Sequence, residues 1–220
     1  EYGRQIQKRS DDGHHIITIL YPGSTFGAES RSWFWQGLSS TLDQQRYAIS
    51  SHIILENEGL SNAESTIDAI IEGADNVIAP DILICLNDTI TEVAYRIVED
   101  RGAEGLVQIV GGSISDTIID GIERGGIAFT ITPNPEDTGR KAFRELERYF
   151  RHGVANYAST VELQVISTEN VEAYRQDAAS VDAVKTAPGI GIAAVEEDSD
   201  LRAGVGAEVP ALAEAAEVVS

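Results

Sequence analysis

Short apolar runs alternate along this chain with segments whose apolar residues recur at helical spacing. The clearest run, residues 82–86, is typical of a strand buried on both faces of a parallel sheet. It ends at three polar residues, and residues 91–100 then carry an apolar stripe that predicts a helix. We expect Asp88 or Thr89 to cap this helix, since both are favoured there, and Asn87 to lie too early to cap it.

The same alternation continues along most of the chain. Further strands are predicted at residues 16–20, 47–55, 106–110, 127–131 and 160–166. Helices are predicted at residues 1–10, 28–43, 61–71, 116–124, 136–152 and 169–174. Strands that alternate with helices on short loops predict an α/β fold with a doubly wound parallel sheet. The pattern fails near residue 177, so we predict an α/β lobe over 1–176 and a weakly structured, Ala/Gly/Glu-rich acidic tail over 177–220.

Composition limits the classes of partner. The net charge of −20 and the pI near 4.4 argue against nucleic acid, because phosphate binding needs a basic face. No apolar run approaches the ~20 residues that a membrane span requires. The chain has no Met and begins at Glu1, so we interpret it as a processed, excised or engineered piece. Cys85 is the only cysteine, and its apolar neighbours predict a buried, inert thiol.

Motifs for catalysis are missing from the sequence. There is no P-loop, no G-x-G-x-x-G and no G-x-S-x-G, and Gly111-Gly112 lacks the rest of a dinucleotide fingerprint. No Cys/His cluster has the spacing of a metal site, and the pair His14-His15 is predicted to lie on the surface. We therefore predict no catalytic residue, no cofactor and no metal.

What remains is a row of hydrogen-bonding side chains in the loops that follow the predicted strands. Its members are Ser24, Thr25, Asn57, Asn87, Asp88, Ser113, Thr132 and Asn134. Open α/β sheets bind ligands at the carboxyl ends of their strands, and mostly uncharged groups there suit a neutral polyhydroxylated ligand. Phe26 in the first loop belongs to the same candidate set. Trp33 and Trp35 follow closely, as a stacking platform for a ring or as one core and one surface residue.

Several motifs occur in the order found in one known family. They are Tyr2-Gly3-Arg4, Asp81-Ile-Leu-Ile-Cys-Leu-Asn-Asp88, Val107-Gln-Ile-Val-Gly-Gly112, Ile118-Ile-Asp-Gly-Ile-Glu-Arg-Gly125, Phe129-Thr-Ile-Thr-Pro-Asn-Pro135 and Glu169-Asn-Val-Glu-Ala-Tyr174. From Glu1 to about Tyr174 the chain resembles the type I periplasmic sugar-binding proteins. The carboxy-terminal lobe of the ribose-binding group is the part that it resembles.

This resemblance implies a flavodoxin-like lobe without catalytic activity, one of two lobes that close on a ligand. It also implies an extracytoplasmic location, periplasmic or as a cell-surface lipoprotein, and a membrane transporter or sensor subunit as partner of the parent protein. Arg31 and Asn87 correspond to ligand contacts of the family. Ser113 stands where the family has Asp, and Thr132-Pro133 stands where a Gln is common, so an ordinary pentose or hexose is less strongly implied.

The sequence leaves alternatives open. Residues 16–80 also resemble the opening of a first lobe, which would make the chain a spliced or deleted form. The lobe could be the effector domain of a sugar-responsive, cytoplasmic repressor, although residues 169–174 resemble the ending of the binding proteins. A doubly wound nucleotide-dependent enzyme is opposed by the missing phosphate loops. We also expect a homodimer, formed through an exposed sheet edge and residues 21–35.

Overall fold

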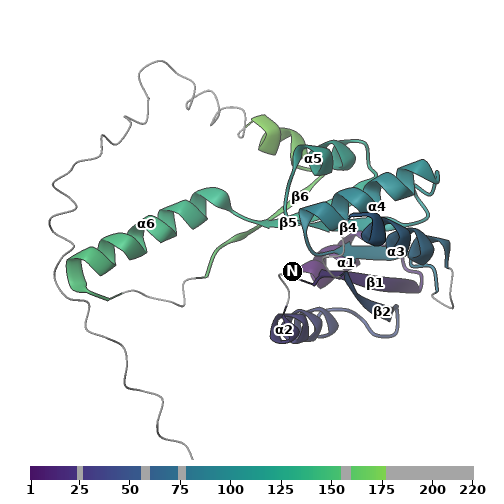
Figure 1. Cartoon of the computed structure of the whole chain (residues 1–220), viewed down its shortest axis with the longest axis horizontal. Helices are drawn as coiled ribbons and strands as arrows, with labels where there is room; N and C mark the ends of the chain where they lie inside the picture. Colours follow the sequence, from purple (N-terminus) through teal and green to yellow (C-terminus); the bar gives the residue numbers. More distant parts are fainter. Residues whose placement is uncertain (24–26, 56–59, 74–77, 155–159, 177–220) are drawn as a thin grey trace, which may run out of the picture. The chain divides into compact units, whose positions relative to one another are not determined.

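The computed structural model describes residues 1–23, 27–55, 60–73, 78–154 and 160–176, without the side chains of 51, 52 and 60–62 (Figure 1). The predicted tail over 177–220 lies outside the described residues. The elements are α1 (Tyr2–Arg9), β1 (His15–Pro22), α2 (Ala28–Ser39), β2 (Tyr47–Leu55), α3 (Leu60–Glu72), β3 (Ile82–Cys85), α4 (Asp88–Asp100), β4 (Gln108–Gly112), α5 (Asp116–Glu123), β5 (Ile127–Pro133), α6 (Pro135–His152) and β6 (Leu163–Ser167). Residues 171–176 add a further helical turn.

The strands form one sheet in the order β2-β1-β3-β4-β5-β6. The first five are parallel in the flavodoxin-like order, which confirms the predicted fold class. β6 pairs antiparallel with β5, so the predicted parallel sheet carries one antiparallel strand at its edge. The reason is local: α6 starts at the carboxyl end of β5, and the chain re-enters the sheet from that same end.

Helices cover both faces of the sheet. The α3, α4 and α5 helices bury one face, and α1 and α2 bury the other (Figure 1). Within β3, Leu83 and Cys85 belong to the first core, and Ile82 and Ile84 to the second. A strand needs apolar residues at every position when both of its faces are covered, which explains the unbroken run seen in the sequence. Burial raises the pKa of the Cys85 thiol, and the predicted inert cysteine is confirmed as buried.

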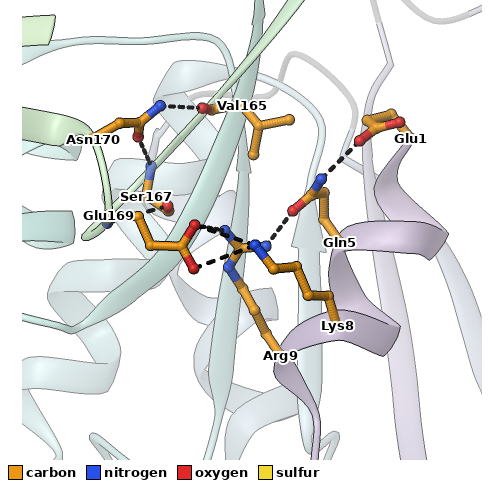
Figure 2. Close-up of polar contacts among 8 residues, drawn as sticks. All are labelled: Glu1, Gln5, Lys8, Arg9, Val165, Ser167, Glu169 and Asn170. Atoms are coloured by element: carbon orange, nitrogen blue, oxygen red, sulfur yellow. Dashed lines mark hydrogen bonds and ion pairs between the residues drawn. The ribbon is translucent and has the colours of Figure 1, made fainter.

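The first helix is fixed at both of its ends. Tyr2 Oη donates to the backbone oxygen of Gly111 at 3.1 Å, and Ile6 is completely buried. At the other end, Lys8 and Arg9 form ion pairs with Glu169, in the turn after β6 (Figure 2). Segments from opposite ends of the described lobe are thereby joined at one side of the sheet.

His15 differs from the sequence expectation. Its imidazole is largely buried, stacks on the Tyr47 ring at 5.3 Å between centroids, and has Nε2 3.1 Å from a carboxylate oxygen of Asp11. His14 is exposed, as expected, with Nδ1 3.0 Å from the Gln45 oxygen. The prediction of a surface pair was therefore wrong for His15, because His15 is the register partner of Tyr47 on β2 and its ring stacks on Tyr47 on the same face of the sheet.

The α6 helix differs from the others in that none of its residues is buried. Figure 1 shows it standing away from the sheet, beyond the end of β5. Its first turn is nevertheless fixed: the carboxylate of Asp137 accepts hydrogen bonds from Glu162 N at 3.0 Å and from Lys141 Nζ at 2.6 Å. No helix in the described part of the chain is long and apolar enough to cross a membrane.

A substitution at Gly112 can test how closely β3 and β4 approach each other. An added Cβ there would lie 2.9 Å from the backbone carbon of Leu86, closer than real contacts allow. We expect Gly112→Ala to lower the free energy of unfolding by about 2–3 kcal/mol, measured by urea denaturation. Gly139→Ala is the matched control, since its Cβ would meet nothing within 4 Å inside α6, and should add about 0.5–1 kcal/mol. Equal effects at the two glycines would contradict this account.

Asp137 makes the attachment of α6 dependent on pH. The hydrogen bond from Glu162 N, and then Lys141, hold the pKa of this carboxyl below its ordinary value. The stabilisation of the folded state by the ionised Asp137 is therefore complete above the pKa of an unfolded Asp, about 3.9. It is lost as the pH falls through the lower pKa that Asp137 has in the folded state. Asp137→Asn should speed amide hydrogen exchange in the first turns of α6 at neutral pH. Glu136→Gln removes a first-turn charge and an exposed pair with Arg140 but no hydrogen bond to Glu162 N, so it should change that exchange much less than Asp137→Asn.

Candidate functional site

The candidate site lies at the carboxyl edge of the sheet, where strand register brings several loops to one level. Leu20 of β1 lies beside Cys85 of β3, and Gly112 of β4 lies beside Ile131 of β5. Because Gly112 is in close contact with the Leu86 backbone, the residues that follow these two positions are neighbours. Asn87 and Ser113, predicted separately from different motifs, are thereby brought together.

Asn87 caps a helix and also presents its amide at this edge. It is the N-cap of α4, and its Oδ1 accepts from Ile90 N at 2.8 Å. The expectation that Asp88 or Thr89 caps this helix was wrong, because α4 begins at Asp88 itself. No described residue accepts a hydrogen bond from Asn87 Nδ2. Since the oxygen is engaged, the amide of this partly buried residue can offer a ligand hydrogen-bond donors.

Asp88 occupies the first position of α4 and is exposed. Its Oδ1 accepts from Thr89 N at 2.8 Å, and a carboxylate at a helix N-terminus is stabilised by the helix dipole. The side chain therefore has a structural role, while its exposed position also leaves it accessible to a ligand at the edge.

Ser113 has an unusual backbone conformation. Its φ is 77°, and it is the only non-glycine residue with positive φ in the described part of the chain. The conformation is held by Ser113 N donating to Ile131 O at 3.0 Å and by Thr130 Oγ1 donating to Ser113 O. A left-handed conformation costs an ordinary residue about 1–2 kcal/mol relative to the right-handed one, and such strain is concentrated at functional sites.

The remaining described candidates contribute less accessible surface. Thr132 is only 6% exposed, and its Oγ1 lies 3.4 Å from Pro133 O. Asn134 is the N-cap of α6, with Oδ1 accepting from Asp137 N at 3.1 Å. Four further candidates lie outside the described residues: Ser24, Thr25, Phe26 and Asn57.

Arg31 lies at a hollow of about 330 Å³ over the carboxyl ends of β1 and β2. The hollow is lined by Tyr21, Ala28, Arg31, Ser32, Trp35 and Ile54. Burial raises the pKa of the Tyr21 phenol, and the Arg31 cation opposes that shift. Trp35 is exposed within this lining, whereas Trp33, also exposed, is not part of it. Tyr21 and Ile54 were missed in the sequence. Ile54 lies inside a predicted strand, and Tyr21, which follows the strand predicted at residues 16–20, belongs to β1 in the structure.

A larger hollow, of about 680 Å³, lies at the opposite, amino edge of the sheet. Its charged groups are already engaged with the protein: Arg9 pairs with Glu169, and the carboxylate of Asp81 accepts from Ile16 N at 2.7 Å. Open α/β sheets bind ligands at their carboxyl edge. We therefore assign the candidate site to the smaller hollow and the adjacent pair Asn87 and Ser113.

The described residues contain no group of three or more His, Cys, Asp or Glu side chains that could hold a metal ion. The chemistry that the carboxyl edge can perform is recognition: an amide donor, a serine hydroxyl, a guanidinium and aromatic surface lie at one edge. These groups can hydrogen-bond a polar ligand and contact an apolar face of a ring.

Comparisons with known proteins identify the fold. No family model matches the sequence, and no curated protein matches it. The structure does match GanP, a glucose-galactose binding protein from Geobacillus stearothermophilus, with a TM-score of 0.63 and 16% identity over 77% of this chain and 58% of that one. It also matches a periplasmic ribose ABC transporter protein from Conexibacter woesei, with a TM-score of 0.64 and 15% identity over 82% and 59% of the two chains.

A third match, the Caulobacter myo-inositol binding protein bound to myo-inositol, has a TM-score of 0.60 and 18% identity over 76% and 56% of the two chains. The lobe therefore has the fold of one lobe of the type I periplasmic binding proteins. The matches support the sequence resemblance as a likeness of fold. The chain spans less than three-fifths of the length of these three structures.

Ser113 allows function to be separated from stability. Glycine adopts positive φ at no steric cost, so Ser113→Gly should raise the free energy of unfolding by about 1 kcal/mol. If the hydroxyl contacts a ligand, the same variant should bind that ligand less tightly. Urea denaturation and ligand titration of the one variant measure both effects. Higher stability with unchanged binding would remove Ser113 from the site.

Proposed function

We propose that this lobe binds a small, polar, predominantly uncharged ligand, such as a sugar or sugar-like compound, at the carboxyl edge, without catalysing a reaction. The observation that carries the proposal is that Asn87 and Ser113 lie together at the carboxyl edge, the same edge of the sheet at which the hollow containing Arg31 is found. Asn87 offers amide donors, and Ser113 is held in a strained conformation that a glycine would adopt more easily.

The chemistry of the edge favours a polyhydroxylated ligand over a phosphate or a nucleotide. A sugar presents hydroxyl groups to hydrogen-bonding side chains and a C–H face to aromatic rings, and both kinds of surface occur here. Gly111-Gly112 does not form a phosphate loop: added Cβ atoms would meet Thr130 at 3.0 Å and Leu86 at 2.9 Å respectively. These glycines permit close packing of the sheet.

The biological role that we propose is that of a solute-binding protein serving a membrane transporter or a sensor outside the cytoplasm. The solved structures of like fold support it, since they include a glucose-galactose binding protein, a periplasmic ribose ABC transporter protein and a myo-inositol binding protein. A single lobe covers one side of a ligand, whereas ligand sites usually bury most of the ligand surface. In this role the described lobe supplies one wall of the site, and a second surface supplies the other.

Isothermal calorimetry tests the proposal directly. Pentoses, hexoses and inositols should be titrated into this chain and into any longer protein that contains it. We expect weak binding where one lobe covers only one side of the ligand, and tighter binding where a second lobe encloses it. If neither binds any member of a broad panel of small polar compounds, the proposed function is contradicted.

The variant Asn87→Ser tests whether the Asn87 amide contacts the ligand. Serine also caps helices well, so the variant should unfold at nearly the wild-type temperature while losing the amide donors. We expect sugar affinity to fall about tenfold or more, as for the loss of one buried hydrogen bond. Gln108→Ala, in the hollow at the amino edge, is the matched control and should leave affinity unchanged. The reverse pattern would place the ligand at the amino edge.

A further inference from the structure

Tyr2, the first residue of α1, contacts two of the elements that carry the candidate site. Its hydroxyl donates to the backbone oxygen of Gly111 at 3.1 Å, two residues before Ser113. On the other side, its ring lies edge-on to the ring of Phe34, with 5.3 Å between the centroids. Phe34 belongs to α2, the helix that also carries Arg31. One side chain therefore connects the end of β4 with the helix beside the hollow.

On the side of α2, the contact continues to the lining of the hollow. The Phe34 ring lies edge-on to the ring of Tyr21, with 6.1 Å between the centroids and 86° between the ring planes. Tyr21 is 1% exposed and lines the hollow that contains Arg31. Edge-to-face contact is a preferred geometry of aromatic pairs, so each ring restricts the next. A shift of the Tyr2 ring would therefore move the wall of the hollow as well.

On the side of β4, the contact acts on the peptide unit between Gly111 and Gly112. The oxygen that accepts from Tyr2 belongs to this planar unit, so the hydrogen bond restricts its rotation. Two glycines in succession allow a wide range of backbone conformations, and this bond favours one of them. The residue after Gly112 is Ser113, whose φ is 77°. The Tyr2 hydroxyl therefore acts on the backbone that leads directly into the candidate site.

The helix that presents Tyr2 is itself fixed at its far end. Lys8 and Arg9 pair with Glu169 at 3.2 and 3.8 Å respectively (Figure 2). The Arg9 guanidinium also lies over the ring of Phe129, 5.1 Å from its centroid, and the Tyr2 ring lies 6.4 Å from the same ring. Because Phe129 is completely buried, both ends of α1 rest on a residue that the core holds in place.

We propose that Tyr2 is a positioning residue of the candidate site, which sets the place of Ser113 relative to the hollow that contains Arg31. Its hydroxyl holds the peptide unit between Gly111 and Gly112, and its ring supports α2. Tyr2 is not among the residues that line the hollow, so it acts through these two contacts and not on the ligand directly. Its effect on ligand binding rests on the proposed function, whereas its effect on Ser113 and α2 exists without a ligand.

NMR signals of the whole 220-residue chain, recorded without ligand, separate the two contacts. Tyr2→Phe keeps the ring and removes only the hydroxyl, so the amide signals of Gly112 and Ser113 should move. The indole signal of Trp35, in α2, should stay in place. The Ser113 amide should also exchange about three- to tenfold faster, as expected for the loss of one hydrogen bond. Tyr2→Leu also removes the ring, so the Trp35 signal should then move; an unchanged Trp35 signal would overturn the coupling to α2.

Tyr47→Phe is the matched control. Tyr47 is 4% exposed and belongs to the core against which Tyr2 packs. Its hydroxyl has no hydrogen-bond partner within the described ranges, and it lies at the amino end of β2. Removal of this hydroxyl should therefore leave the signals of Gly112, Ser113 and Trp35 in place. Circular dichroism shows which variants are folded, and if Tyr2→Leu is not, Tyr2→Phe decides the proposal by itself.

Sugar titration of the same variants completes the test, in this chain or in a longer protein that contains it. Tyr2→Phe should lower sugar affinity about three- to tenfold, and Tyr47→Phe should leave it unchanged. Signals of Gly112 and Ser113 that move no more in Tyr2→Phe than in Tyr47→Phe would overturn the proposal, as would moved signals with unchanged sugar affinity. If the signals move as expected but the wild type binds no sugar, the restraint on Ser113 is upheld and the proposed function is refuted instead.

Discussion

The close approach of β3 and β4 at Gly112 is the constraint on which the candidate site depends. With only hydrogen at that position, the Leu86 backbone comes close enough to set the ends of the two strands at one level. Asn87 can then begin α4 while its amide remains at the edge, and Ser113 is turned into positive φ by its hydrogen bond to Ile131. A larger residue at 112 would separate both side chains.

Much of this arrangement could be predicted because local sequence patterns determine it. The apolar run at β3 predicted a strand covered on both faces, and the polar residues after each strand predicted an edge that binds a ligand. The antiparallel β6 could not be predicted in this way, since an apolar run carries no information about its direction. The partial burial of His15 depended on its stacking with Tyr47, a contact between distant residues that sequence spacing does not reveal.

The site itself was predicted less completely, for a related reason. The predicted set included Asn87 and Ser113 but not Tyr21 or Ile54. Ile54 was expected within a strand and Tyr21 just after one, and both line the hollow from β1 and β2. The helix cap was placed one residue too late because Asn, Asp and Thr all favour that position, and only the observed start of α4 distinguishes them. The Asn87 side-chain oxygen consequently caps α4, while no described residue accepts a hydrogen bond from its amide nitrogen, a combination that residue type alone cannot show.

The most direct test of the account is to map a bound sugar onto the lobe by amide chemical shifts in solution. Titration of a sugar that binds should shift the backbone amides of Arg31, Asn87 and Ser113 together, with one dissociation constant, and leave those around Gly125 at the amino edge unchanged. Shifts confined to the amino edge, with Asn87 and Ser113 unaffected at saturation, would contradict the claim that the carboxyl edge is the binding site.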